Sequence, residues 1–227
     1  MDETIVGLLD RNADHAATFD GRFDDVQEGQ WPDAVTVCCS DSRVLGDHMW
    51  DNSDPGHLFS CGNIGNRVVQ RTEAGHVVSG DVLYPLAHAG TDTAVVVVGH
   101  TGCGAVTATY DALTEGVAEP PGIQHCIDLL APQLEAGVEA LSADLDRSAA
   151  INRLVEYNVD RQVEFLLESD DVPEGVDVVG AVYDFQDVYG DRRGEVHVIN
   201  VDGDRDVGQL RAAHPDVDDR IRRLWTY

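Results

Sequence analysis

The chain has 227 residues and is strongly acidic: 42 acidic residues against 15 basic ones give a formal net charge of −27, and it contains no lysine. We expect no nucleic-acid partner, because phosphate binding needs a basic face and the arginines form no large cluster. The densest apolar run, residues 94–98, is far shorter than the ~20 residues of a membrane-spanning helix. The sequence therefore predicts no insertion into a membrane.

The missing lysines and the excess of acidic residues indicate a high-salt environment. At ordinary salt such a surface repels itself, whereas at molar salt a Debye length of about 3 Å largely screens that repulsion. An acidic surface kept merely for solubility explains the missing lysines less well. We expect a halophilic protein.

Cysteine usage and the N-terminus indicate the compartment. Residues 1–4 carry an acidic pair where a secretory signal carries basic residues. The five cysteines are an odd set in a chain without an export signal, which argues against a disulfide framework and for a reducing compartment. We expect a cytoplasmic protein.

Hydrophobic periodicity predicts the elements in chain order. The first half reads as a helix over 4–19, strands over 34–38 and 57–61, a helix over 74–89, a strand over 94–98 and a helix from near Cys103. After a connection over 115–122 come helices over 123–141 and 148–168, strands over 176–183 and 195–201, and a helix over 207–224. The first helix has a thin apolar face, so residues 1–30 are expected to be an arm that packs on a partner subunit.

This order predicts an α/β fold. Helices that alternate with strands favour a mostly parallel central sheet flanked by helices. The last two strands flank a polar turn, so the second of them is expected as an antiparallel edge strand. One core suffices at this length, and we expect a single domain over residues 1–227.

Two runs of β-branched residues end in loops that carry metal-binding side chains. Cys39 follows the first run, and His100 and Cys103 follow the second. Ligands collect at the carboxyl ends of parallel strands, so these loops can converge. Two thiolates and an imidazole suit zinc, and three protein ligands leave its fourth position open for water.

Asp41 and Arg43 lie beside the first of these ligands. Asp41 can bind the metal directly or accept a hydrogen bond from a water on the metal. A two-pronged hydrogen bond from the Arg43 guanidinium to the Asp41 carboxylate would decide between the two roles. Spacing alone leaves open a catalytic zinc, a structural zinc and simple burial of the cysteines. Cys38 is the available fourth ligand for a structural zinc, although neighbouring strand residues point to opposite faces.

The motifs Cys39-Ser40-Asp41-Ser42-Arg43 and Gly99-His100-Thr101-Gly102-Cys103-Gly104 resemble the signature pair of the β-class carbonic anhydrases. Further matches at residues 55–59, 63–66, 158–159 and 180–184 extend the resemblance over about residues 30 to 203. It implies reversible hydration of carbon dioxide to bicarbonate and a proton. It also implies one zinc ion per chain, bound by Cys39, His100 and Cys103, and a homodimer or a dimer of dimers.

The same resemblance implies roles for the remaining site residues. Asp41 and Arg43 would be the catalytic dyad that orients the water on the metal, and in a closed resting form Asp41 would itself bind the metal. For substrate binding, Gln30 would donate a hydrogen bond to bicarbonate, and the backbone N–H of Gly104 would also contact it. Phe59, Ile64 and Tyr84 would form the apolar pocket for carbon dioxide. Tyr84 and external buffer are the candidate proton shuttles.

The sequence departs from the family pattern at two positions. Thr36 and Gly62 stand where regulated members have the tryptophan and arginine of a non-catalytic bicarbonate pocket. We therefore expect a plant-type-like active site with an open metal position at neutral pH and without that form of inhibition. The alternatives are a hydrolase of carbonyl sulfide or carbon disulfide on the same zinc, and an inactive zinc-binding scaffold. A redox role is disfavoured because the chain has no Cys-x-x-Cys.

Overall fold

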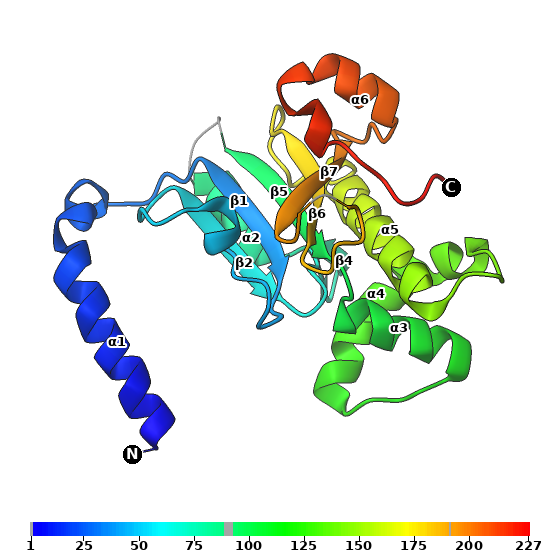
Figure 1. The fold of residues 1–227 in the computed structure, drawn as a ribbon, viewed down its shortest axis with the longest axis horizontal. Helices are drawn as coiled ribbons and strands as arrows, with labels where there is room; N and C mark the ends of the chain where they lie inside the picture. The colour runs from blue at the N-terminus through cyan, green and yellow to red at the C-terminus, as the bar shows by residue number, and fades with distance from the viewer. Residues whose placement is uncertain (1, 89–92, 191) are drawn as a thin grey trace.

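In the computed structural model, which describes residues 2–88, 93–190 and 192–227, a five-stranded sheet has the order β2-β1-β5-β6-β7 (Figure 1). Strands β1 (Ala34–Cys39), β2 (Leu58–Asn63), β5 (Ala94–His100) and β6 (Val178–Asp184) run parallel. Strand β7 (Glu195–Val201) pairs antiparallel with β6. The predicted α/β fold, mostly parallel with an antiparallel edge strand, is confirmed.

The long helix α5 (Arg147–Leu167) lies across one face of the sheet, against β5 and β6. It begins at Asp146, whose side chain accepts a hydrogen bond from the Ala149 N–H and so caps the helix. Helices α3 (Gly104–Glu115) and α4 (Pro121–Ala140) pack beside α5, and α2 (Gly80–His88) packs on β1 and β2. The predicted connection over 115–122 thus joins α3 to α4.

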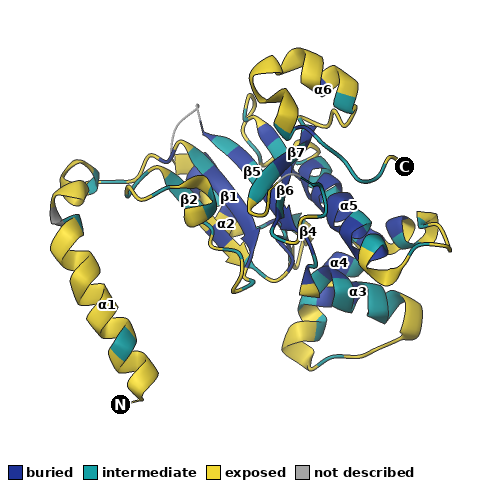
Figure 2. Ribbon diagram, viewed as in Figure 1, coloured by how far each residue is buried: buried dark blue, intermediate teal, exposed yellow. Residues whose placement is uncertain are grey.

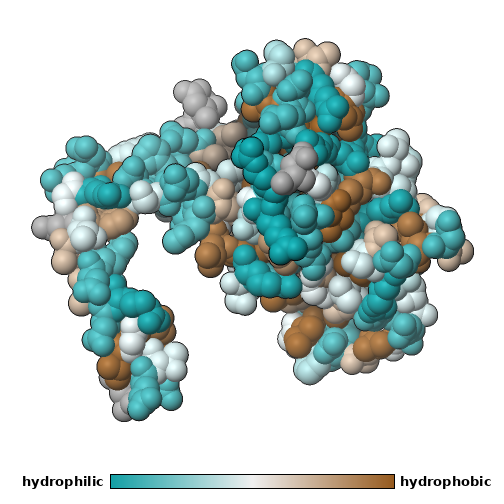
Figure 3. Space-filling view, viewed as in Figure 1, coloured by the Kyte–Doolittle hydropathy of each residue, from teal (hydrophilic) through white to brown (hydrophobic). Residues whose placement is uncertain are grey.

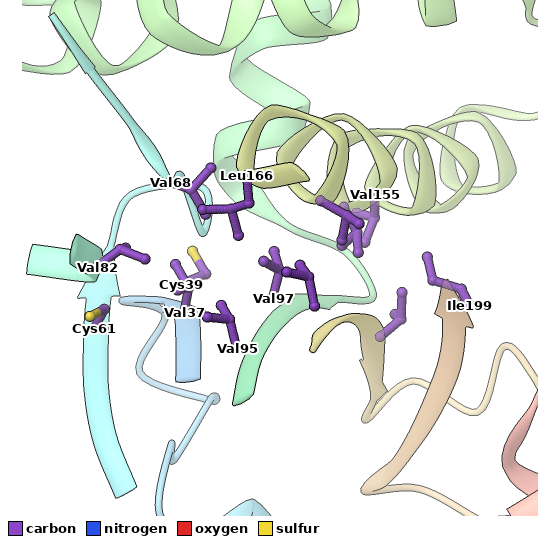
Figure 4. Packing of buried hydrophobic residues seen from close by; sticks show 14 of the residues in the cluster. Val37, Cys39, Cys61, Val68, Val82, Val95, Val97, Val155, Leu166 and Ile199 are labelled. Carbon is purple, nitrogen blue, oxygen red and sulfur yellow. The ribbon is translucent and has the colours of Figure 1, made fainter. Parts of the chain in front are cut away.

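The core fills the space between the sheet and these helices. Figure 4 shows buried valines of β1 and β5 on the same side of the sheet as Val155 and Leu166 of α5. Val95 and Val97 of β5 are fully buried on this side, whereas Val96 of β5 and Val179 of β6, on the opposite face of the sheet, are half-buried and line a groove of about 560 Å³. The dark-blue strands and the inner face of α5 in Figure 2 mark this layer.

The helix predicted over 74–89 is wrong in its first part. Strands β3 (Val69–Thr72) and β4 (Gly75–Val78) form a separate antiparallel hairpin, and α2 begins only at Gly80. Val78 at the end of β4 and Val82 in the first turn of α2 are both buried and are four residues apart. Their spacing is that of one face of a helix, although they lie on two different elements. Ala89, the last residue of the predicted helix, lies outside the described residues.

The helix predicted over 207–224 is wrong beyond its first two turns. Helix α6 (Val207–Ala213) ends before Pro215, and a 3₁₀ segment, η3 (Pro215–Arg220), follows. Proline disfavours helical backbone at the preceding residue, and His214 has φ −125° and ψ 65°. The chain then turns extended: Ile221 bridges Val198 of β7 in parallel, and the Arg222 N–H donates to the Val198 carbonyl.

The N-terminal arm stands away from the sheet (Figure 1). It consists of α1 (Glu3–Phe19) and a 3₁₀ turn, η1 (Asp20–Val26), and none of the α1 residues is buried (Figure 2). A second 3₁₀ turn, η2 (His48–Trp50), lies between β1 and β2. No helix among the described residues combines the length and the apolar composition that crossing a bilayer requires.

Candidate metal centre

The carboxyl ends of β1 and β5 bring three potential metal ligands together. Cys39 is the last residue of β1, His100 is the last residue of β5, and Cys103 is the N-cap of α3. Because β1 and β5 are paired neighbours, these ends lie side by side. The donor atoms of all three residues lie within 4.8 Å of one another, and the two sulfurs are 4.0 Å apart.

His100 presents an unsatisfied nitrogen to this cluster. The side chain is fully buried, and its Nδ1 lies 3.0 Å from the Thr101 carbonyl oxygen, which favours the tautomer with hydrogen on Nδ1. Its Nε2 is buried and has no hydrogen-bond partner among the described residues. A buried nitrogen without a partner costs free energy, and a bound cation would remove that cost.

A hydrogen bond couples the two thiols, whose sulfurs are 4.0 Å apart. The hydrogen bond from Cys103 lowers the pKa of the Cys39 thiol to about 4, although burial opposes this shift. The bond to Cys39, together with burial, raises the pKa of the Cys103 thiol well above its usual range. The backbone N–H groups of Ala105 and Val106, at the start of α3, act in the opposite direction on Cys103. A cation in place of the proton of this hydrogen bond would favour two thiolates.

Asp41 and Arg43 form a preformed fork beside the cluster. The Arg43 side chain donates to Oδ1 of Asp41 at 2.8 Å and to Oδ2 at 2.6 Å, and the Arg43 N–H donates to Oδ1 at 2.9 Å. These bonds from Arg43 hold the pKa of the Asp41 carboxyl well below its usual range. Oδ2 of Asp41 is 3.8 Å from Nε2 of His100, so the carboxylate lies at the edge of the cluster.

The ring of Phe185 supports both parts of the site. It lies under the Arg43 guanidinium, 4.7 Å from the ring centre, and stacks on the His100 imidazole with the centroids 5.7 Å apart. The carboxylate of Asp184 holds the loop that follows β6 by accepting hydrogen bonds from three backbone N–H groups, those of Gln186, Val188 and Tyr189. These hydrogen bonds hold the backbone on both sides of Phe185 and so fix the position of its ring.

The loop between His100 and Cys103 depends on contacts from distant parts of the chain. Gly102 has φ +63°, and its N–H donates to the Asn152 side chain at 2.8 Å. A Cβ at this position would lie 2.7 Å from the Gln186 side chain. Asn152, Gln186 and Phe185 have no role in the sequence analysis, because they are 50 or more residues from the loop and no local pattern joins them to it. The matches at 158–159 and 180–184 lie near these residues in the chain but include none of them.

The structural zinc with Cys38 as fourth ligand is not supported. Of the described histidine, cysteine and acidic residues, only Cys39, His100 and Cys103 form a group of three that could hold a metal. Cys38 is buried, and burial raises the pKa of its thiol to about 12. Cys38 and Cys39 are neighbours on β1, so their side chains point to opposite faces of the sheet.

The substrate-binding candidates divide into two places. Ile64 is 44% exposed and follows Asn63, which pairs with Cys39 across β1 and β2. Gly104 is the first residue of α3 and has open space where a side chain would be. Phe59 on β2 packs partly buried against the core. Gln30 and Tyr84 instead line a groove of about 550 Å³, which none of the three ligand residues lines.

The family model described as carbonic anhydrase matches residues 34–192, a span that contains the three ligands and the Asp41–Arg43 fork. The chain belongs to the β-carbonic anhydrase family. Among its relatives, a carbonic anhydrase of Mycolicibacterium smegmatis is 32% identical over 133 residues, which cover 57% of this β-carbonic anhydrase and 55% of that protein. The chain spans about half the length of the curated relatives it matches.

Solved β-carbonic anhydrases share the fold. The β-carbonic anhydrase CcaA superposes with a TM-score of 0.71 at 21% identity, over 87% of this chain and 86% of that chain. A structure from a study of two tetrameric β-carbonic anhydrases of the ascomycete Sordaria macrospora gives 0.68 at 21% identity, over 88% and 98%. β-Carbonic anhydrases are zinc enzymes, and the paired thiols and the free imidazole nitrogen fit that ion, so zinc is the cofactor here.

Proposed function

We propose that this protein catalyses the reversible hydration of carbon dioxide to bicarbonate and a proton, with Cys39, His100 and Cys103 as its zinc ligands. The observation that carries the proposal is the buried ligand cluster beside the Asp41–Arg43 fork. Zinc bound at such a cluster supplies Lewis acidity that activates water for attack on a carbonyl carbon. Two thiolates and a neutral imidazole bind the dication without leaving excess charge in the buried site.

Asp41 acts as an orienting acceptor in this proposal. An ionised carboxylate only accepts hydrogen bonds, so Asp41 favours an oxygen that carries a hydrogen at the position beside it. The hydrogen bond to Asp41 would then direct a lone pair of that oxygen toward the carbon of carbon dioxide. Arg43 occupies both carboxylate oxygens and keeps Asp41 ionised and away from the ligand cluster. This arrangement supports an open metal position at neutral pH.

Substrate contacts come from two chains in this proposal. Ile64 and Phe59 supply apolar surface for carbon dioxide, and the Gly104 N–H contacts bicarbonate. Gln30 and Tyr84 line a groove apart from the ligands, so we assign them to the site of a second copy of the chain. The exposed arm and the tetrameric relatives from Sordaria macrospora support a homodimer or a dimer of dimers.

Two further properties belong to this proposal. Thr36 and Gly62 stand in place of the tryptophan ring and the arginine guanidinium that form a second, non-catalytic bicarbonate site. We therefore expect no sigmoidal inhibition of the enzyme by bicarbonate. All five cysteine thiols are unpaired, two of them as proposed ligands, which suits a reducing cytoplasm of high salt. Residues 1–227 then act as one domain whose arm packs on the partner.

The substitution Asp41→Asn tests the function. The amide lacks the charge that Arg43 stabilises and can donate where the carboxylate only accepts. We expect kcat/KM for carbon dioxide hydration, measured by stopped flow at molar salt, to fall about 100-fold or more. Zinc content should stay at one ion per chain, because the three ligands are unchanged.

The matched control is Asp54→Asn, which also breaks a pair with an arginine, Arg22, but on the exposed surface. It should leave the rate unchanged. A wild-type protein that holds zinc and hydrates no carbon dioxide would contradict the proposal. Faster turnover of carbonyl sulfide or carbon disulfide than of carbon dioxide would also contradict it and favour the related hydrolase.

A further inference from the structure

The carboxylate of Asp184, at the end of β6, is a buried anchor for the loop that follows this strand. The residue is 1% exposed. Its Oδ1 accepts hydrogen bonds from the Gln186 N–H at 3.0 Å and from the Thr101 hydroxyl at 3.2 Å. Its Oδ2 accepts from two further N–H groups of the same loop, at 2.7 and 2.8 Å. A carboxylate is buried at tolerable cost only when such bonds are made, so this network fixes the loop and with it Phe185.

Thr101 ties the same anchor to the imidazole of His100. The fully buried Thr101 donates its hydroxyl hydrogen to Asp184, and its N–H donates to the Tyr183 carbonyl at 3.1 Å. Its own carbonyl oxygen lies 3.0 Å from Nδ1 of His100. A hydrogen bond at Nδ1 sets the orientation of the ring and leaves Nε2 free for the cluster. Asp184 therefore fixes His100 and the Phe185 loop relative to each other.

The Phe185 ring is the surface on which the Arg43 guanidinium rests. The guanidinium carbon lies 4.7 Å from the ring centre, and the planes of the Phe185 and His100 rings are 25° apart. The side chain of Arg43 is 51% exposed, so solvent surrounds about half of it. Apart from its bonds to Asp41, it makes one hydrogen bond to the described residues, to the Gly102 carbonyl at 3.4 Å. The aromatic face, which attracts the cation, is thus the main further restraint on this arginine.

Asp41 is within reach of the metal whenever Arg43 releases it. Its Oδ2 lies 3.8 Å from Nε2 of His100. Two donor atoms that bind one zinc ion at about 2.0–2.3 Å lie about 3.3–3.8 Å apart in tetrahedral geometry. Arg43 and a bound metal would therefore compete for the same carboxylate. Whatever holds Arg43 in place keeps the fourth metal position open to a small anion.

We propose that Phe185, anchored by Asp184, is a positioning residue that holds Arg43 across Asp41 and so keeps the fourth metal position open. The inference rests on the proposed zinc ligands and on the proposed role of Asp41. Phe185 acts through Arg43 and contacts neither the substrate nor the metal. The aromatic face matters more than the volume of the side chain, because an aliphatic side chain of similar size does not attract the cation.

Azide binding to the full-length protein loaded with Co²⁺ tests this inference without turnover. Azide binds an open metal position, and the visible absorption of Co²⁺ reports its binding. Phe185→Leu removes the aromatic face, so Asp41 should compete better with azide. We expect the azide Kd, at fixed pH in molar sodium sulfate, to rise about two- to fivefold, which corresponds to one cation–π contact near the surface. For the zinc-loaded protein, kcat/KM for carbon dioxide hydration should fall by a similar factor. Phe185→Tyr keeps the face and should restore both values.

A double-mutant cycle with Arg43→Met separates positioning from general loosening. Arg43→Met removes the guanidinium and should weaken azide binding more than Phe185→Leu does. Because Phe185 acts through Arg43, adding Phe185→Leu to Arg43→Met should change the azide Kd no further. Equal fold-changes in both backgrounds would overturn the inference. So would a wild-type Kd in folded Phe185→Leu, or a Kd in Phe185→Tyr as weak as in Phe185→Leu.

Tyr110→Leu is the matched control. The Arg147 guanidinium lies 5.6 Å from the centre of the Tyr110 ring and donates to both carboxylate oxygens of Asp111, at 2.5 and 2.7 Å. This group repeats the ring, the arginine and the aspartate at a place further along α3. The variant should lower thermal stability and leave the azide Kd and the rate unchanged. A change in Kd as large as that in Phe185→Leu would overturn the inference.

Phe185→Met covers the case in which Phe185→Leu does not fold. Its flexible side chain fills irregular space without an aromatic face, so the azide Kd should rise by the same factor, whereas an unchanged Kd overturns the inference. Hydration of carbon dioxide by the wild type is measured in parallel. The expected azide results in a protein without that activity would refute the proposed function alone. A wild type that binds no Co²⁺ would refute the ligand set and this inference together.

Discussion

His197 on β7 is the buried residue whose protonation the fold opposes most directly. Its side chain is fully buried, neither ring nitrogen has a hydrogen-bond partner among the described residues, and the ring stacks on Tyr189 with centroids 4.6 Å apart. Burial lowers the pKa of the imidazole. Glu195 and Asp184 oppose this shift, and Arg222 and Arg220 reinforce it. The folded chain therefore holds His197 neutral.

This environment predicts acid sensitivity. The unfolded chain binds a proton at His197 near pH 6.5, whereas the folded chain resists it, so stability falls as the pH drops below that value. His197→Phe keeps the stacked ring and removes the titration. We expect the free energy of unfolding, measured by urea titration at pH 7 and pH 5, to fall less in this variant than in the wild type. The exposed His125→Phe should behave like the wild type, and an equal slope in all three proteins would refute the effect.

The sequence predicted the metal-binding residues better than the residues that support them. Cys39, His100 and Cys103 lie at the carboxyl ends of two apolar strands, which an apolar run in the sequence reveals. Such ends lie at the same edge of a parallel sheet, so this one topological rule is enough to bring the three residues together. Asn152 and Phe185 act through contacts with residues 50 or more positions away in the chain. Asn158 belongs to the match at 158–159, but only the fold shows that its amide binds Gly65 and Asn66.

At the scale of elements, α1 is a helix without an internal partner. Ile5, Leu8 and Leu9 are 45–55% exposed and share one side of the helix, and Figure 3 shows apolar side chains gathered near its N-terminal end. A 17-residue helix is marginal in water when nothing packs on it. Packing on a second copy would provide the missing burial.

We expect the double substitution Leu8→Asp and Leu9→Asp to dissociate the oligomer. Analytical ultracentrifugation at molar salt should show the wild type as a dimer or tetramer and the variant as a smaller species. Carbon dioxide hydration should fall in parallel, because Gln30 and Tyr84 would leave the partner's site. Arg11→Ala, on the same helix, serves as the control and should leave the mass unchanged. A monomeric wild type with full activity would contradict the role of the arm.

The C-terminal tail is tied to α5 by a buried ion pair. Arg223 and Asp160, with side chains 5% and 2% exposed, form a fork with contacts of 3.2 and 2.6 Å. The Tyr227 hydroxyl donates to the same carboxylate, and Arg223 also donates to the Ile199 carbonyl. Asp160 would remain as a buried charge without its cation if Arg223 were lost.

Arg223→Met should therefore lower the free energy of unfolding by about 3–5 kcal/mol, as measured by urea denaturation. The double variant Asp160→Leu with Arg223→Met should recover part of this loss, because no buried charge is left unpaired. Arg192→Met removes an arginine that is 79% exposed and should change stability by less than about 1 kcal/mol. If Arg223→Met were as mild as Arg192→Met, the pair would not anchor the tail.

Elements were predictable where one periodicity held over their whole length. The strand over 195–201 matches at both ends and the helices over 123–141 and 148–168 match within two residues, because apolar residues recur at one spacing along their whole length and face one core. The β3–β4 hairpin was missed because its strands of four residues each, buried only at Val69 and Val78, show no alternation of their own. The tail was predicted as helix because its extended part pairs with β7, a contact that sequence spacing does not show.

At the scale of the whole molecule, the net charge of −27 predicts stabilisation by salt. Raising NaCl from 0.1 to 2 M shortens the Debye length from about 10 Å to below about 3 Å and screens the mutual repulsion of the carboxylates. We expect the melting temperature to rise over this range, and an uncharged osmolyte at equal osmolality should not reproduce the rise. The triple variant Asp216→Asn, Asp218→Asn and Asp219→Asn, at three exposed positions, should show a smaller rise. A flat or falling melting temperature would contradict the electrostatic account.

The tail that runs along β7 limits how the sheet can grow. Residues 221 and 222 take up hydrogen-bonding positions on the outer side of that strand, whereas β2, at the opposite border, pairs only with β1 within the described chain. The tail occupies the border at β7 around Val198, whereas the whole length of β2 on its outer side has no strand partner among the described residues, so a second copy would extend the sheet most readily at β2. Two copies joined through β2 would form a closed two-fold pair.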